Sequence, residues 1–310
     1  MDETVSKTLD LAVMHALRAD LPDADPSRAR VVGRGWDVIA WRVPAPDSDW
    51  LVRVPRLAEA RPTIEAQHRL AAALEGTGVP MPREPRLLRG ADGEVVAGLY
   101  RYVDGEVARV SGRAARGRLA TSIAEFLSTL HALDPAIGLR CGATPSILWR
   151  DVYQPMIERC AGSLGTATEA WVRAMGARLE QASGTMPPLT LLHADLKPEH
   201  VLIDGEQRIL AVLDFEGMQV SDPARDFSRL IQNWDPAFAS MVLQQYRGSV
   251  DEGFLVRAQC YRDFDALEAV DTSIRRGWSE WLPRARRDLA ARAAAATRWR
   301  RRLLTLPAGG

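Results

Sequence analysis

Cysteine is scarce in this sequence, and its few cysteines do not follow a paired spacing. There are three, Cys141, Cys160 and Cys260, widely separated along the chain. An odd count without paired spacing argues against a disulfide framework and against a structural zinc site. This cysteine usage is typical of a protein that works in a reducing cytoplasm.

Long apolar runs and an excess of charge of one sign are also absent. No apolar run approaches the ~20 residues of a membrane-spanning helix, and the first twenty residues lack the apolar core of a signal peptide. Lys+Arg 40 balance Asp+Glu 40, so no global field favours nucleic acid or an anionic membrane. We therefore expect a cytoplasmic protein that binds neither partner, and a monomer, with a dimer as the alternative.

What is present is enough chain for two lobes around a cleft. The 310 residues are 46% hydrophobic and 26% charged, a globular profile. Alternating apolar positions predict antiparallel strands in VVGRGWDVIAWRV, DWLVRVP and EVVAGLYRYV, whereas helical spacing dominates from residue 112 onward. We predict an α+β fold with an N-terminal antiparallel sheet lobe over residues 1–103 and a mainly helical C-terminal lobe over residues 104–310.

The polar groups with the most informative spacing lie between residues 191 and 227. His200 follows Asp195 by five residues, and Asp214 follows the apolar run ILAVL. The runs VLI and ILAVL on either side of a DGEQ turn predict a hairpin. Asp195 and His200 would precede this hairpin and Asp214 would follow it, so two carboxylates and an imidazole can converge at one end.

This stretch resembles the catalytic and metal-binding segments of the kinase-like phosphotransferases. His193-Ala194-Asp195 with His200, and then D-F-E-G from Asp214, correspond to the H-R-D-x-x-x-x-N and D-F-G strings of protein kinases. No A-P-E segment follows, which argues against a protein kinase. The form H-x-D-L-x-P-x-H-V-L-I-D, followed by L-D-F-E and D-P-A-R-D-F, is similar to the aminoglycoside phosphotransferase family, which includes macrolide kinases. The resemblance extends over residues 30–270 and implies a bilobal, protein-kinase-like fold.

The resemblance also implies roles in phosphoryl transfer, a reaction dominated by positioning and charge neutralisation. Asp195 would orient the acceptor hydroxyl and accept its proton. Lys197 would steady the γ-phosphate, with a surface lysine as the alternative reading. His200 and Asp214 would bind Mg²⁺. Histidine is an unusual ligand for this hard ion, so Mn²⁺ is an alternative metal for the site.

The resemblance implies nucleotide-binding residues in the first lobe. Gly33 and Gly35 would form a turn whose N–H groups cover the phosphates of ATP or GTP. Arg53 stands where a kinase has its strand lysine, with Arg56 as a competitor. Glu65, in the following helix, is expected to pair with Arg53.

The nucleotide base would bind the segment that joins the lobes. Main-chain groups of Arg101 and Val103 are the expected partners. Main-chain pairing leaves no side-chain signature, so ATP and GTP are not distinguished.

The hydroxyl acceptor is expected to bind the helices after Asp214. Residues 251–271 carry six acidic residues against two basic ones, and an acidic wall would suit a cationic amino sugar. A solvated acidic helix face is the other interpretation. Three tryptophans, Trp234, Trp278 and Trp281, could stack on a sugar, or could pack in the core. The acidic candidates are Asp263, Glu268 and Asp271.

Three further polar residues are predicted to be structural. Asp222 can cap the helix that begins at Pro223. In the resembled family the aspartate at the position of Asp226 braces the catalytic loop. His131 is interpreted as a structural histidine at a helix C-terminus.

Several functions are compatible with these residues. The first is a nucleoside-triphosphate-dependent kinase that inactivates an antibiotic of the aminoglycoside or macrolide type, with nucleoside antibiotics as further candidates. The second is a metabolic kinase of a small amino alcohol or sugar. A nucleotide-binding pseudo-kinase is disfavoured by the intact Asp195, His200 and Asp214. A metal-dependent hydrolase is disfavoured by the absence of a second histidine pair.

Overall fold

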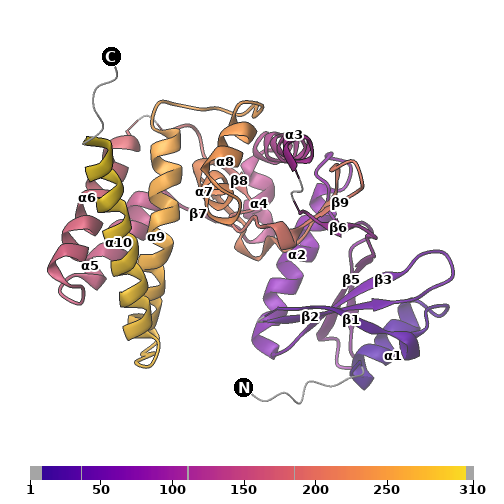
Figure 1. Cartoon of the computed structure of the whole chain (residues 1–310). Helices are drawn as coiled ribbons and strands as arrows, with labels where there is room; N and C mark the ends of the chain where they lie inside the picture. Colours follow the sequence, from indigo (N-terminus) through magenta and orange to yellow (C-terminus); the bar gives the residue numbers. More distant parts are fainter. Residues whose placement is uncertain (1–8, 36, 110–111, 185, 305–310) are drawn as a thin grey trace.

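A computed structural model describes residues 9–35, 37–109, 112–184 and 186–304, with side chains up to residue 296. Figure 1 shows a sheet lobe at one end of the molecule and a group of helices at the other, with α2 running between them. The predicted bilobal α+β architecture is therefore confirmed.

The sheet lobe is a five-stranded antiparallel sheet with the order β1-β2-β3-β5-β4. Alternating apolar side chains bury Trp41, Trp50 and Val52 beneath α1, in a core separate from that of the helical lobe. The elements are α1 (Leu11–Asp20), β1 (Arg30–Arg34), β2 (Val38–Val43), β3 (Trp50–Pro55), α2 (Arg61–Leu74), β4 (Arg86–Arg89) and β5 (Val95–Arg101).

Helix α2 belongs to both lobes. Ile64, near its start, packs with the sheet strands, whereas Leu70 and Leu74 join the helical core. The middle of α2 therefore faces the junction of the two lobes. The sequence-based division at residue 103 falls in the segment 102–105 between β5 and β6, and we propose it as the lobe boundary.

The second lobe is mainly helical, with short strands that carry the polar loops. Its core gathers apolar side chains from nearly every helix, so it forms one hydrophobic unit. Its helices are α3 (Gly112–His131), α4 (Pro135–Cys141), α5 (Gln154–Cys160), α6 (Thr166–Ala182), α7 (Ala224–Asn233), α8 (Pro236–Leu243), α9 (Phe254–Arg275) and α10 (Leu282–Leu304). Its strands are β6 (Glu106–Val107), β7 (Thr144–Pro145), β8 (Thr190–Leu192), β9 (Val201–Ile203), β10 (Ile209–Val212) and β11 (Gln219–Ser221).

The predicted hairpin is present as β9 and β10, which pair antiparallel. Asp204 closes the turn by accepting from the main chain of Glu206 and Arg208. A second small sheet pairs β8 with β11 antiparallel, and the two sheets hold the polar loops between them.

Two short helices were not predicted, although each has a local signal. Both α4 and α8 begin at a proline that follows an aspartate, and Asp134 and Asp235 each accept a hydrogen bond from a main-chain N–H of the first turn. Among the described helices, none is long and apolar enough to cross a membrane.

Candidate active site

The loop between β8 and β9 carries Asp195, and a buried carboxylate of α7 holds its main chain. Asp226 accepts from the N–H of His193 (3.1 Å) and of Ala194 (2.6 Å). His131, at the end of α3, contacts the same carboxylate through Nε2 at 3.0 Å. The prediction that Asp226 braces this loop and that His131 is structural is confirmed.

Two more side chains of α7 fix the carbonyl groups of the loop. Arg229 donates from Nε to the carbonyl of Ala194 (2.8 Å), and Asn233 donates from Nδ2 to the carbonyl of Leu196 (2.8 Å). Ala194 has a φ of 63°, a left-handed conformation that disfavours a residue with a Cβ. The loop is therefore held in a strained shape by hydrogen bonds from one helix face.

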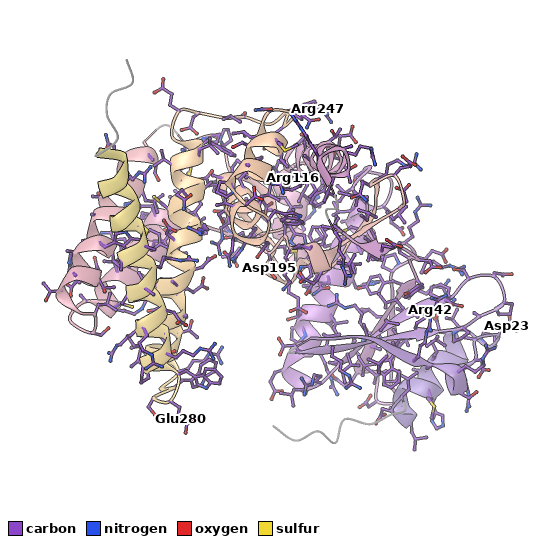
Figure 2. The ribbon with its side chains drawn as sticks, viewed as in Figure 1. Asp23, Arg42, Arg116, Asp195, Arg247 and Glu280 are labelled. Carbon is purple, nitrogen blue, oxygen red and sulfur yellow. The ribbon has the colours of Figure 1, made fainter. Side chains whose placement is uncertain are left out.

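Asp195 presents its carboxylate at the edge of the helical lobe (Figure 2). Its side chain is 40% exposed, and Lys197 Nζ lies 3.3 Å from Oδ2. The main-chain N–H of Asp195 donates to His193 Nδ1 at 3.2 Å. The loop thus aims one carboxylate and one ammonium group into solvent at the same place.

His200 and Asp214 meet next to this loop. His200 Nδ1 lies 3.0 Å from the carbonyl oxygen of Asp195, and because a carbonyl only accepts, Nδ1 carries the proton. In a neutral ring Nε2 then presents a lone pair 3.2 Å from Asp214 Oδ2. Two acceptors this close repel unless a cation, either a proton on His200 or a metal ion, joins them.

This pair fits a Mg²⁺ ion that is completed by phosphate ligands. Adjacent ligands of an octahedral ion with bonds of about 2.1 Å lie about 3 Å apart, which matches the His200–Asp214 separation. The described residues contain no group of three or more His, Cys, Asp or Glu side chains arranged to hold a metal. Such an ion therefore depends on oxygens from its substrate, as Mg²⁺ commonly does.

Asp214 remains ionised down to low pH. Burial raises the pKa of its carboxyl. The contact with His200 and the charge of Arg53 lower the pKa by more than burial raises it, so that it falls to about 2. Burial and the charge of Asp214 raise the pKa of the neighbouring Glu216. Arg53 Nη2 lies 3.4 Å from each of these two carboxylates and offsets part of their repulsion.

The predicted ion pair between Arg53 and Glu65 is wrong. Arg53 donates instead to the side-chain oxygen of Gln67, two residues further along α2. Glu65 faces another side of the helix and lies 3.8 Å from Arg69. A two-residue offset rotates a helical side chain by about 200°, so of these two residues Gln67 faces β3 and Glu65 faces away from it.

Of the two arginines that competed for the phosphate role, only Arg53 lies beside Asp214. Arg56 donates from Nη1 to the carbonyl of Gly35 (3.3 Å) and so supports the glycine turn. Gly33 pairs with Ala40 across β1 and β2, and Gly35 donates to the carbonyl of Val38 (2.8 Å). Trp36, which follows Gly35, lies outside the described residues.

The segment that joins the lobes has one main-chain donor already engaged. The N–H of Arg101 donates to the carbonyl of Arg83 at 2.9 Å. The side chain of Arg101 stacks over Trp50, 4.1 Å from the ring centroid. A base that pairs here would therefore use the carbonyl of Arg101 and the main chain of Val103.

The three acidic acceptor candidates on α9 have different surroundings. Asp271 is 1% exposed and accepts from Arg159 (2.7 Å) and Arg275 (2.8 Å), so its assignment to an acceptor is wrong. Asp263 pairs with Arg262 at 2.8 Å. Glu268 is exposed and lines a pocket of about 320 Å³.

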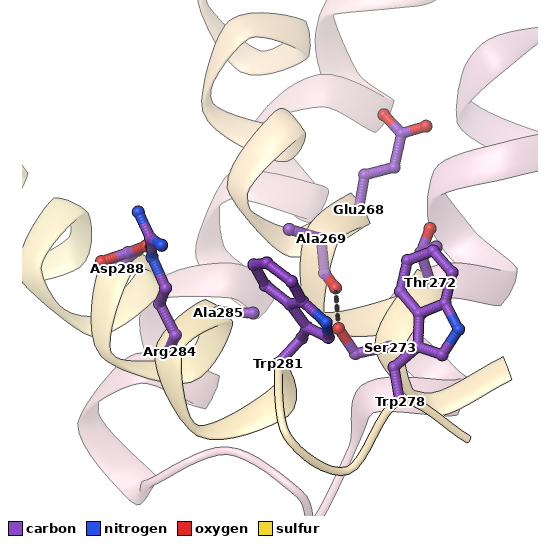
Figure 3. Close-up of a pocket in the computed structure, with 9 residues that line it drawn as sticks. All are labelled: Glu268, Ala269, Thr272, Ser273, Trp278, Trp281, Arg284, Ala285 and Asp288. Atoms are coloured by element: carbon purple, nitrogen blue, oxygen red, sulfur yellow. Dashed lines mark hydrogen bonds and ion pairs between the residues drawn. The ribbon is translucent and has the colours of Figure 1, made fainter. Parts of the chain in front are cut away.

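That pocket lies at the turn between α9 and α10 (Figure 3). Trp278 and Trp281 contribute exposed indole rings, 47% and 57% accessible. Trp234, in contrast, is partly buried and stacks on the core residue Phe238, with 5.5 Å between ring centroids. Trp234 therefore fits the interpretation as a packing residue, whereas Trp278 and Trp281 face solvent and remain candidates to stack on a sugar.

Sequence reasoning missed Gln67, Arg229 and Asn233 as site residues. For the last two a signal existed, because Asp226, Arg229 and Asn233 recur at helical spacing and share one face of α7. Gln67 carries no charge and gave no signal. Its role follows only from the placement of α2 beside β3.

Comparisons with known proteins point to one family. A sequence model of the phosphotransferase enzyme family (APH) matches residues 28–270. The chain is 29% identical over 110 residues to the uncharacterized protein YcbJ of Bacillus subtilis (strain 168), a match over 34% of this chain and 35% of that one. The chain thus spans about a third of the length of this relative.

Solved structures share the fold. The GDP complex of wild-type aminoglycoside 2′-phosphotransferase-IIIa has a TM-score of 0.78 and 21% identity, covering 91% of this chain and 98% of that chain. The apoenzyme of macrolide 2′-phosphotransferase MphH from Brachybacterium faecium has a TM-score of 0.74 and 22% identity, covering 91% and 98%. At these low identities, the TM-scores show a shared fold and nothing about the substrate of this chain.

Proposed function

The chain belongs to the phosphotransferase enzyme family, and on this premise we propose that it transfers the γ-phosphoryl group of ATP or GTP to a hydroxyl of an antibiotic. The acceptor would be of the aminoglycoside or macrolide type, and phosphorylation would inactivate it. Solved proteins of the same fold are named as phosphotransferases of both antibiotic classes.

One observation carries this proposal. A carboxylate at Asp195, an ammonium at Lys197 and the His200–Asp214 pair converge at one edge of the helical lobe, opposite Arg53 of the sheet lobe. Phosphoryl transfer needs such convergent charges, because positioning and neutralisation of the transferred group dominate its catalysis.

In the proposed mechanism Asp195 orients the acceptor hydroxyl and takes its proton as the bond from the hydroxyl oxygen to the γ-phosphorus forms. The bond from that phosphorus to the bridging oxygen breaks, and the nucleoside diphosphate leaves. The half-exposed carboxylate can reach a substrate, while the loop behind it is fixed by Asp226 and Arg229. Lys197 Nζ lies 3.3 Å from Asp195 Oδ2, so its ammonium group can contact the transferred phosphoryl group while Asp195 holds the acceptor hydroxyl. The site therefore holds base and cation in a geometry that is set before substrate arrives.

His200 and Asp214 would hold Mg²⁺, which supplies charge neutralisation for the phosphates when bound. Arg53, held by Gln67, would contact the phosphates from the sheet lobe. The turn at Gly33 and Gly35 would cover them with main-chain N–H groups.

The pocket of Glu268, Trp278 and Trp281 is our candidate for part of the acceptor site. Glu268 lies one helical turn beyond Asp265, which pairs with Arg229 at 2.7 Å and so adjoins the catalytic loop. Indole faces beside a carboxylate favour an amino sugar, since the rings can stack on it and the carboxylate can bind its ammonium group. Asp263 lies on the same helix and is kept as a second candidate.

The first test is Asp195→Asn. We expect kcat to fall by at least about a hundredfold with little change in nucleotide affinity, because the change removes only the proton acceptor. Turnover would be measured with a coupled assay and nucleotide affinity by calorimetry. Asp23→Asn, an exposed carboxylate on the sheet lobe (Figure 2), is the matched control and should behave as wild type. Near-normal turnover of Asp195→Asn would exclude the proposed base.

The acceptor class is tested by supplying ATP or GTP with a panel of aminoglycosides, macrolides, nucleoside antibiotics and amino alcohols. Phosphorylation of an antibiotic, together with resistance of a sensitive host that expresses the chain, would support the proposal. Turnover with an amino alcohol or sugar alone would favour the metabolic kinase. Glu268→Gln and Asp263→Asn would then report which carboxylate sets KM for the acceptor.

A further inference from the structure

A second and larger cavity lies in the helical lobe, away from the catalytic carboxylates. Its volume is about 580 Å³, and we call it the back cavity. It is bounded by the last turn of α3, the segment 187–190 that leads into β8, and the loop 246–249 after α8. In Figure 2 Arg247, which lines it, lies at the top of the view, whereas Asp195 lies lower, facing the sheet lobe.

The walls of the back cavity are largely preformed. Four prolines line it, Pro135, Pro187, Pro188 and Pro223, and their rings fix the local backbone. A cavity of this size with rigid walls falls in the range of small-molecule sites, and a ligand would lose little free energy in ordering it. Leu133 and Leu189 add apolar surface for the body of such a ligand.

The polar groups of the back cavity favour an anion. Among the described residues that line it, none is acidic and Arg247 is the one with a permanent charge. The main-chain N–H of Arg247 donates to Ser128 Oγ at 3.0 Å, which fixes the base of this side chain at the rim. Within the described part of the chain, no carboxylate pairs with its guanidinium group. Thr190 Oγ1, also in the lining, is buried without a hydrogen-bond partner among those residues.

The lining is connected to the catalytic loop in two ways. Tyr246 and His131 both line the cavity, and the hydroxyl of Tyr246 lies 2.7 Å from His131 Nδ1. His131 Nε2 lies 3.0 Å from Asp226, whose carboxylate holds the N–H of Ala194. Thr190, moreover, begins the strand that runs directly into the loop.

The direction of the hydrogen bonds follows from Asp226. Its carboxyl has a lowered pKa and, when ionised, only accepts, so His131 Nε2 carries the proton and donates to it. In the neutral ring Nδ1 then accepts from the hydroxyl of Tyr246. A ligand against the Tyr246–His131 pair would therefore act on the carboxylate that holds Ala194 in its strained conformation.

We propose that the back cavity is a regulatory site for a small organic anion. A carboxylate or phosphate group of the ligand binds Arg247 at the rim. The apolar body of the ligand packs against the prolines. The ligand changes the position of Asp195 through His131 and Asp226, because it binds with different affinity when Asp226 holds the loop and when the loop is released from Asp226.

The binding test uses benzoate as the anionic probe and benzyl alcohol as its neutral counterpart of similar shape. Ligand-observed NMR titration should show benzoate binding to the full chain at least about tenfold more tightly than the alcohol, the factor for one charge-assisted hydrogen bond. Arg247→Gln should remove this preference and Arg247→Lys should keep most of it. Arg118→Gln, an exposed arginine of α3 outside the cavity, is the matched control.

The location and the coupling are tested separately. Ala132→Trp should fill the cavity and abolish benzoate binding, because this exposed residue lines it. Hydrogen exchange of the amides of residues 193–195 should slow with benzoate in the wild type and in Arg118→Gln, but not in Arg247→Gln.

Three outcomes would overturn the proposal. They are no benzoate binding at millimolar concentration, equal binding of benzoate and benzyl alcohol, and binding that leaves the exchange of the loop amides unchanged. None of these readouts depends on phosphotransfer or on the identity of the acceptor.

Discussion

Arg53 is the residue whose surroundings differ most from a lysine–glutamate pair. A guanidinium group has several donors in a fixed plane, so Arg53 can bind neutral Gln67 and still face Asp214 and Glu216. The positive charge is then not neutralised by a helix carboxylate. It remains directed at the metal-binding carboxylate and at the phosphates that would lie there.

This arrangement predicts the effect of Arg53→Gln. We expect kcat/KM for the nucleotide to fall by roughly ten- to a hundredfold, because a charge-assisted contact to phosphate is lost. Initial-rate kinetics with varied nucleotide would measure it. Arg89→Gln, on the exposed edge strand of the same sheet, should keep wild-type kinetics. Equal effects of the two changes would mean that Arg53 has no special role.

At the scale of elements, α7 is joined to α9 by buried charge. Arg257 has a fully buried side chain and donates from Nε to Asp222 (2.6 Å), which also accepts from Ala224 at the start of α7. Arg257 reaches Asp251 (2.7 Å) and the carbonyl of Ala182 at the end of α6 (2.8 Å) as well. One guanidinium group thus fixes the start of the helix that clamps the catalytic loop.

Arg257→Met should lower the free energy of unfolding by about 3–5 kcal/mol, because it leaves the carboxylate of Asp222 buried without its cation. Urea unfolding followed by circular dichroism would measure the change. Arg262→Met, at a partly exposed residue further along α9, should cost less than about 1 kcal/mol. A small loss at Arg257 would mean that Asp222 finds other partners or water.

For the molecule as a whole, Asp226 joins α3, α7 and the catalytic loop, and this makes the free energy of unfolding depend on pH. Burial raises the pKa of Asp226, but its hydrogen bonds from His131 and the loop outweigh burial and lower the pKa below 3.8. Its contribution is therefore complete above the unfolded value and is lost as pH falls through the lowered folded value.

The corresponding prediction compares wild type with Asp226→Asn. At neutral pH the variant should unfold at lower urea concentration, because asparagine cannot replace a buried carboxylate that accepts several hydrogen bonds. The difference in free energy of unfolding should shrink as pH falls below about 4, where the carboxyl of the unfolded wild-type chain begins to take up a proton while that of the folded protein is still ionised. Urea titrations from neutral to acidic pH would show this. For Asp23→Asn, which is exposed, the two curves should stay parallel.

The sequence predicted best where the chemistry is local. The hairpin between Asp195 and Asp214, the aspartate cap before Pro223 and the brace at Asp226 all depend on residues within one short stretch, and the structure contains each. The Arg53–Glu65 pair and the assignment of Asp271 failed for one reason. Each depended on which face of a helix meets a distant element, and composition does not report that orientation.

By itself the sequence determined that a strand-rich first lobe precedes a helical second lobe, and the spacing that brings Asp195, His200 and Asp214 together. Periodicity and turn residues are properties of neighbours along the chain, so they are readable without a fold. Only the tertiary structure decided that Gln67 faces Arg53, that Arg257 is buried, and that a cavity lies behind the catalytic loop. These features arise from packing between segments far apart in sequence, where burial and the rotation of each helix choose the partners.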